Sequence, residues 1–131
     1  MDTRIKVMVV EDSGIIVQRL YTILSEIDFI KSIAHAKNGE EAITLLKLIT
    51  TSLVILDIKL PILNGIEVLK HIKVHYPKTR VIMLTNYTNS QYKELCLSLG
   101  AEIFLDKSTE FEQILTVINS MDGKLTSNLN S

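Results

Sequence analysis

The sequence predicts an α/β fold in which helices cover both faces of a parallel sheet. Five short aliphatic runs recur along the chain, and a segment of helical period follows each of them. The runs are rich in Val, Ile and Leu and lack regular polar alternation, as expected for parallel strands that are buried on both sides. Strict alternation of strands and helices implies right-handed crossovers within one sheet.

The expected strands and some helix ends can be placed on the chain. Asn38 is positioned to cap the second helix, and Gly100 follows the fourth helix as a C-cap would. Thr109 and Glu112 have the spacing of a capping box before the last helix. We expect the strands at residues 5–10, 32–36, 53–56, 80–84 and 102–105.

Length and composition indicate one domain with a sizeable core. The chain has 131 residues, of which 47% are hydrophobic. We expect a domain at residues 1–121, followed by a polar tail or the start of a linker at 122–131, because that stretch has no helical pattern. No apolar stretch approaches the roughly 18 residues of a membrane span, so membrane insertion is not expected.

The net charge and the cysteine content argue against a nucleic-acid-binding protein and against a disulfide-stabilised one. The formal net charge is −1, which gives no basic surface of the kind that binds nucleic acid directly. The single cysteine, Cys96, rules out an internal disulfide, so we expect a cytoplasmic protein with Cys96 in its core. The three histidines, His35, His71 and His75, are interpreted as surface or edge residues without metal-ligand spacing.

Polar side chains follow the strands at the ends where a ligand site is expected. Glu11 and Asp12 follow the first strand, Asp57 the third, Thr85 the fourth and Lys107 the fifth. In an open α/β sheet these positions share one edge. Carboxylates gathered there repel one another unless a cation is present, and Mg²⁺ is the divalent ion that prefers oxygen ligands and works with phosphate. A lysine and a hydroxyl bind phosphoryl oxygens, and an aspartate can itself form an aspartyl phosphate.

Four motifs together resemble the receiver domain of two-component response regulators. They are "VVEDS" (9–13), the D-x-x-x-P-x-x-x-G run from Asp57 through Pro61 to Gly65, "MLTN" (83–86) and "FLDKS" (104–108). The resemblance covers residues 4 to 121. It implies a flavodoxin-like (βα)5 fold with strand order 2-1-3-4-5.

The resemblance also implies a phosphoacceptor and its metal. Asp57 corresponds to the residue that accepts a phosphoryl group from the phosphohistidine of a histidine kinase or phosphotransfer protein. Glu11 and Asp12 correspond to the acids of the Mg²⁺ site, which Asp57 and the backbone carbonyl of Lys59 complete. Catalysis then comes mostly from positioning and charge neutralisation.

A switch and a partner surface are implied in the same way. Thr85 and Lys107 correspond to the residues that bind phosphoryl oxygens, and Phe104 to the switch aromatic that turns inward. In the family, a downstream protein commonly binds the face of helix 4, strand 5 and helix 5, here residues 88–121, and receivers can dimerise through that face. Such a domain is a regulatory switch and not an enzyme.

The chain departs from the family pattern at three positions. Ser108 replaces the usual proline after the lysine, which leaves the shape of the loop at 106–109 open. Asn86 is larger than the small residue often found after the threonine, and Lys59 is basic where a neutral or acidic side chain is more usual. Both are expected to alter the lifetime of the phosphoryl group.

Three other functions compete with the phosphorylated switch. A constitutive adaptor that is never phosphorylated is the main alternative. A phosphatase of the haloacid-dehalogenase type usually needs a second acid where Lys59 stands. A flavin carrier needs a phosphate-binding first loop, whereas the loop "EDSGII" is acidic.

Overall fold

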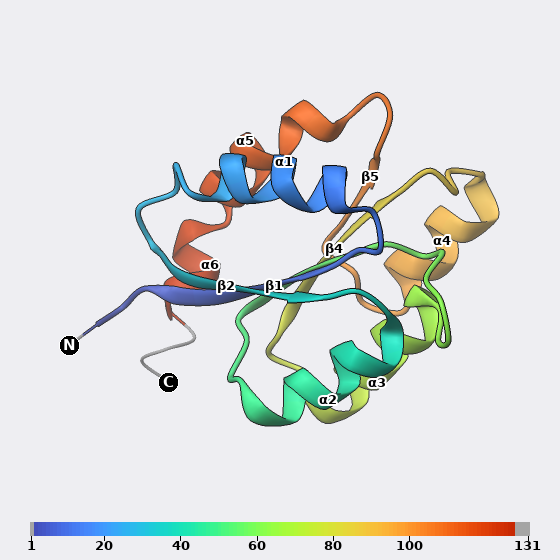
Figure 1. Cartoon of the computed structure of the whole chain (residues 1–131), viewed down its shortest axis with the longest axis horizontal. Helices are drawn as coiled ribbons and strands as arrows, with labels where there is room; N and C mark the ends of the chain where they lie inside the picture. The colour runs from blue at the N-terminus through green and yellow to red at the C-terminus, as the bar shows by residue number, and fades with distance from the viewer. Residues whose placement is uncertain (1, 128–131) are drawn as a thin grey trace.

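A single five-stranded parallel sheet forms the centre of the computed structural model, which describes residues 2–127. The strands are β1 (Ile5–Val10), β2 (Ile30–Ala36), β3 (Leu53–Leu56), β4 (Arg80–Thr85) and β5 (Ile103–Asp106). Their order is β2-β1-β3-β4-β5, and every neighbouring pair is parallel (Figure 1). The predicted fold class and strand order are therefore confirmed.

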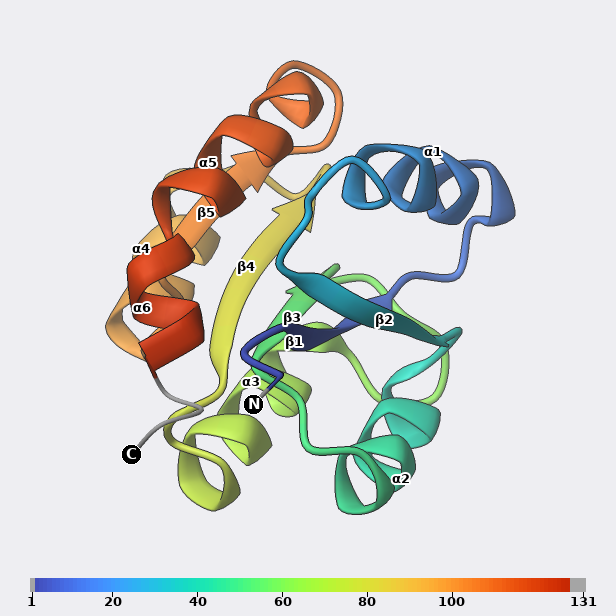
Figure 2. The same ribbon diagram turned by 90° about the vertical axis from the view of Figure 1, so that its left-hand side faces the viewer.

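Helices form a layer on each face of the sheet, as Figures 1 and 2 show. One layer contains α1 (Gly14–Leu24), α5 (Ile114–Ser120) and α6 (Asp122–Ser127), with a short 3₁₀ helix, η1 (Phe111–Gln113), before α5. The other contains α2 (Gly39–Leu48), α3 (Gly65–His75) and α4 (Ser90–Ser98). Within residues 2–127, none of these helices has the length and apolar character needed to cross a membrane.

Strand β1 shows why the strands are apolar along their whole length. Val7 and Val9 belong to the core cluster that packs against α1 and α5, whereas Met8 and Val10 belong to the cluster on the side of α2 and α3. All four side chains are at most 1% exposed. Because successive side chains point to opposite faces and both faces are covered, polar alternation would bury polar groups.

Asparagine side chains cap three of the helices. The Oδ1 atom of Asn38 accepts a hydrogen bond from the Glu41 amide at 2.7 Å, which confirms the predicted cap of α2. Asn64 and Asn89 make the same contact at the starts of α3 and α4, at 3.1 and 2.9 Å. Gly100 ends α4 with φ of +110°, a left-handed conformation that favours glycine, as predicted for a C-cap.

The expected polar tail is wrong over its first six residues, because Asp122–Ser127 form helix α6. Leu125 is fully buried in the cluster that contains Ile114 and Ile118, and its amide donates to the Met121 carbonyl at 2.9 Å. A single apolar residue in a polar run gives no helical period, so the sequence does not predict this helix. Packing of Leu125 against the residues of α5 accounts for it. The core thus extends beyond residue 121, and residues 128–131 lie outside the described part.

Shortening Leu125 tests this packing. Leu125→Ala is expected to lower the free energy of unfolding by about 2–4 kcal/mol, because it removes a fully buried side chain and leaves a cavity. Urea unfolding measures the change. Leu97→Ala is the matched control, since Leu97 on α4 is 40% exposed and its truncation is expected to cost less than about 1 kcal/mol. Equal losses in the two variants would contradict the docking of α6.

Candidate functional site

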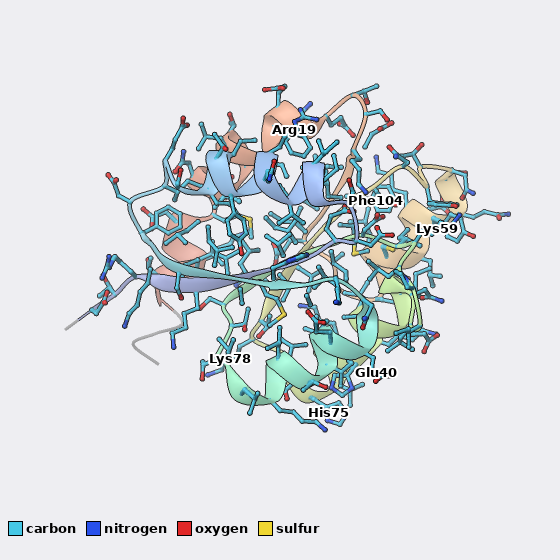
Figure 3. The ribbon with its side chains drawn as sticks, viewed as in Figure 1. Arg19, Glu40, Lys59, His75, Lys78 and Phe104 are labelled. Carbon is cyan, nitrogen blue, oxygen red and sulfur yellow. The ribbon has the colours of Figure 1, made fainter. Side chains whose placement is uncertain are left out.

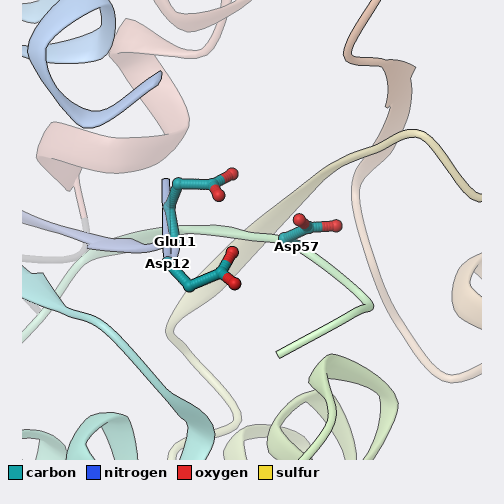
Figure 4. Close-up of side chains that lie close together, drawn as sticks. All are labelled: Glu11, Asp12 and Asp57. Carbon is teal, nitrogen blue, oxygen red and sulfur yellow. The ribbon is translucent and has the colours of Figure 1, made fainter. Parts of the chain in front are cut away.

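Three carboxylates converge where β1 and β3 end (Figure 4). Glu11 and Asp12 follow β1, and Asp57 follows β3 with its amide donating to the Val10 carbonyl at 3.2 Å. One carboxylate oxygen from each of the three acids lies within 4.8 Å of the other two. Glu11 and Asp57 are buried, at 2% and 6% exposure, whereas Asp12 faces solvent. The predicted meeting of these acids at one sheet edge is therefore confirmed.

Lys107 joins two of the three acids from the end of β5. Its Nζ atom lies 2.6 Å from Asp57 Oδ2 and 2.6 Å from Glu11 Oε1. Its amide donates to the Thr85 carbonyl at 2.9 Å, which holds the lysine beside β4. A single ammonium group is thus shared by two buried carboxylates, and the cluster keeps an excess of negative charge.

The pKa values of this cluster follow from burial and from these hydrogen bonds. Burial by itself lowers the pKa of Lys107, but the hydrogen bonds to Asp57 and Glu11 outweigh it, so the net shift is upward. Burial raises the pKa of Glu11, and the hydrogen bonds from Lys107 and from the Ser13 amide oppose that rise without cancelling it. The charged form of Glu11 is therefore less favoured here than in water, and additional positive charge nearby would favour it.

The donor set fits a hard divalent cation. Among residues 2–127, Asp57 Oδ1 is a buried oxygen without a hydrogen-bond partner, although Oδ2 of the same carboxylate is paired. An unpaired buried oxygen beside two further carboxylates is a costly arrangement that a cation relieves. Oxygen ligands in this number suit Mg²⁺, which keeps several waters when it binds proteins.

A cavity of about 460 Å³ opens beside the acids. It lies between the loop after β3 and the loop after β4. Its lining includes Lys59 and Asn86, two of the departures from the family pattern. The lining residues are Asp12, Asp57, Lys59, Leu60, Pro61, Asn86 and Tyr87.

The two predicted switch residues are both buried. Thr85 is the last residue of β4 and is fully buried, with its Oγ1 accepting a hydrogen bond from the Tyr87 amide at 3.1 Å. Phe104 lies on β5 opposite Met83 and is 8% exposed, so its ring is already inside the core cluster on the α2, α3 and α4 side. The hydroxyl of Thr85 is therefore engaged with its own loop.

The loop after Lys107 has a shape that the sequence left open. No peptide bond between residues 2 and 127 is cis, so the bond before Ser108 is trans. Asp106 Oδ1 accepts from the Ser108 and Thr109 amides at 2.8 and 3.3 Å, and Ser108 Oγ donates to Asn86 Oδ1 at 2.8 Å. The predicted capping box is wrong, because Glu110 makes the contact back to the Asp106 amide at 2.9 Å.

Two contacts near the acids were missed from the sequence. His35 Nε2 lies 2.8 Å from the carbonyl oxygen of Glu11, because β2 places His35 beside Val9 of β1. Asp106 organises the lysine loop through its side chain, and the "DKS" spacing typical of an Asx turn was the available signal. The His35 contact had no such signal, since it depends on strand register.

Comparison with known proteins shows the family of this chain. The family model of the response regulator receiver domain matches residues 7–119. The chain is 36% identical over 107 residues to a protein-glutamate methylesterase/protein-glutamine glutaminase of Methanococcus maripaludis, covering 80% of this chain but only 29% of that enzyme. It is 32% identical over 118 residues to protein CcdB of Bacillus subtilis, covering 90% of this chain and 98% of CcdB.

A solved structure extends the comparison to three dimensions. The response regulator domain of Thermotoga maritima CheB superposes with a TM-score of 0.80 at 30% identity, covering 95% of this chain and 97% of that one. Sequence, fold and the arrangement of acids and lysine thus point to the same family. The chain belongs to the receiver domains of two-component response regulators.

Proposed function

We propose that this receiver is a cytoplasmic, phosphorylation-dependent switch whose phosphoacceptor is Asp57. The unequal environment of the two Asp57 carboxylate oxygens carries the proposal. Oδ2 is held by Lys107 at 2.6 Å, whereas Oδ1 is buried without a partner in the described part of the chain. The carboxylate of Asp57 also lies close to those of Glu11 and Asp12. Such a carboxylate is oriented rigidly and is ready for a cation and a phosphoryl group.

The chain's residues have distinct roles in the transfer. A carboxylate oxygen of Asp57 forms the bond to phosphorus while the phosphorus–nitrogen bond of a phosphohistidine breaks, and the released imidazole of the kinase or phosphotransfer protein keeps that electron pair. Lys107 orients Asp57 and supplies positive charge to the phosphoryl oxygens. Glu11, Asp12, Asp57 and the backbone carbonyl of Lys59 would hold Mg²⁺. Held there, Mg²⁺ would supply positive charge to the transferred group.

The conformational response starts at Thr85. If its hydroxyl turns to donate to a phosphoryl oxygen, the Tyr87 amide loses its present acceptor and the loop before α4 is free to move. Tyr87 is 38% exposed, and its ring lies edge-on to Tyr92 with centroids 6.1 Å apart. We propose that a downstream protein, or a second copy of the chain, binds the α4, β5 and α5 face, where Leu95 and Leu97 are also partly exposed.

The test is intact mass after incubation with Mg²⁺ and acetyl phosphate. A gain of one phosphoryl group is expected for the natural chain and no gain for Asp57→Asn or in the presence of a chelator. No gain in the natural chain, with folding verified and a working receiver as positive control, would leave the constitutive adaptor as the better function. We assign no enzymatic activity beyond assistance of the chain's own phosphorylation and dephosphorylation.

Lys59 and Asn86 are expected to set the phosphoryl lifetime. Both line the cavity beside Asp57, and the Lys59 ammonium lies 5.8 Å from the centroid of the Tyr87 ring. Lys59→Ala and Asn86→Ala are each expected to change the dephosphorylation rate several-fold, because they alter access or order of the attacking water. Decay of the phosphorylated mass measures the rate, and Lys31→Ala, at an exposed lysine on β2, is the control. Rates equal to that control would refute this role.

A further inference from the structure

A pair of histidines on α3 lies outside the phosphorylation site. His71 and His75 are one helical turn apart, and their ring centroids are 4.3 Å apart with an angle of 40° between the ring planes. The expectation that the histidines lack ligand spacing is therefore wrong for this pair. A separation of four residues places both imidazoles on one face of a helix, which is the spacing that helical zinc sites use.

The pair lines a groove of about 430 Å³ between α2 and α3. Glu67 precedes His71 by four residues, but its carboxylate is paired with Lys70 at 3.4 Å. Among the described residues it does not lie close enough to both imidazoles to share an ion with them. The groove is lined by Ile43, Leu63, Glu67, Lys70, His71, Val74 and His75.

The chemistry of the pair suits a transition metal ion. Neutral imidazole nitrogen binds Zn²⁺, Cu²⁺ and Ni²⁺, with zinc–nitrogen bonds of about 2.0–2.1 Å, whereas Mg²⁺ prefers oxygen ligands. The two imidazoles supply nitrogen ligands of this kind from one face of α3.

We infer that His71 and His75 form a second metal site, which binds a divalent transition metal ion through the two imidazoles, with water completing the shell. The site is separate from the acids around Asp57. Helix α3 begins at Gly65, and a rise of about 1.5 Å per residue carries the chain about 15 Å along the helix axis by His75. Figure 3 shows His75 at the outer edge of the α2 and α3 layer, far from Lys59.

Calorimetric titration of the full chain with Zn²⁺, in excess Mg²⁺ to occupy the acidic site, tests the inference. One Zn²⁺ per chain with micromolar affinity is expected, since Lys47 and Lys70 lie nearby and oppose a cation. His71→Ala and His75→Ala are each expected to weaken binding about tenfold or more, because loss of a ligand exceeds the effect of losing a supporting contact. Asp57→Asn is expected to leave the affinity for Zn²⁺ unchanged.

A double variant tests whether the spacing of the two histidines matters or only their number. Lys70→His combined with His71→Ala keeps three histidines in the chain but places the α3 pair five residues apart, on different faces of the helix. This variant is expected to bind Zn²⁺ as weakly as His71→Ala. Binding that persists in both single alanine variants, or that is restored in the double variant, would overturn the site.

Nuclear magnetic resonance gives a readout that does not depend on affinity alone. Each of the three histidines contributes its own imidazole proton signals. Substoichiometric Zn²⁺ is expected to shift the signals of His71 and His75 and to leave those of His35 in place. Shifts confined to His35, or equal at all three rings, would also overturn the site.

Discussion

Replacing Lys107 with methionine is expected to lower the free energy of unfolding by about 3–5 kcal/mol near neutral pH in the presence of a chelator. The Lys107 side chain is only 10% exposed, and its ammonium contacts two carboxylates of 3% and 7% exposure. Methionine fills a similar volume without charge. Glu11 and Asp57 then lie in a buried site without a cation. Buried carboxylates left unpaired in this way destabilise the fold more than uncharged side chains at the same positions would.

The stability that Lys107→Met loses is expected to be smaller at lower pH. Burial already raises the pKa of Glu11 in the natural chain, and loss of the ammonium raises it further. The folded variant therefore binds a proton that the unfolded chain releases near the ordinary pKa of 4.5. Stability falls as the pH rises above that value, so the deficit relative to the natural chain shrinks as the pH is lowered towards about 5.

Urea unfolding with a chelator at several pH values measures this deficit. Lys31→Met is the control, because Lys31 and Asp2 form an exposed pair at 3.5 Å whose loss is expected to cost less than about 1 kcal/mol. Mg²⁺ is expected to restore part of the stability of Lys107→Met, since it supplies positive charge at the same place. A deficit no larger than that of Lys31→Met, or one that grows towards acid pH, would show that Lys107 does not neutralise the buried acids.

Gly65→Ala is the second substitution with a large expected effect. A Cβ atom at Gly65 would lie 1.8 Å from the carbonyl oxygen of Asp57 and 2.7 Å from its carbonyl carbon. Both atoms belong to the backbone, so no side-chain rotation relieves the clash. The Gly65 amide also donates to the Ile58 carbonyl at 2.7 Å, which ties the start of α3 to the loop that carries Asp57. We expect the free energy of unfolding to fall by about 3 kcal/mol or more and Asp57 to be displaced.

Two measurements distinguish the loss of stability in Gly65→Ala from the displacement of Asp57. Urea unfolding gives the stability, and the rate of phosphorylation by acetyl phosphate under conditions where the variant stays folded reports the position of Asp57. Gly123→Ala in α6 is the matched control, since a Cβ atom there meets nothing within 4 Å. That change is expected to be neutral or to stabilise by about 0.5–1 kcal/mol, because alanine favours helices over glycine. If Gly65→Ala behaves like Gly123→Ala, the loop after β3 tolerates a side chain and the close approach is not required.

The acid and lysine cluster shows how far reasoning from sequence reaches. Asp57 and Lys107 are 50 residues apart, yet their meeting was predictable, because the carboxyl ends of parallel strands share one edge of a sheet. Which acids Lys107 pairs with was not predictable. It contacts Glu11 and Asp57 while Asp12 stays exposed, and that choice depends on side-chain orientation and burial around β1.

The layered α/β architecture, the places of the strands and the meeting of Glu11, Asp12, Asp57 and Lys107 at one sheet edge could all be read from the sequence. They could be read there because strand burial, helical period and the residue that follows each strand are local properties of the chain. Three features could not be read from the sequence. Asp122–Ser127 form a helix, Asp106 and Asn86 organise the loop of Ser108, and the ring of His71 lies next to that of His75 beside the α2–α3 groove. These features arise from contacts between elements, whose energies depend on packing and orientation and leave no period in the sequence.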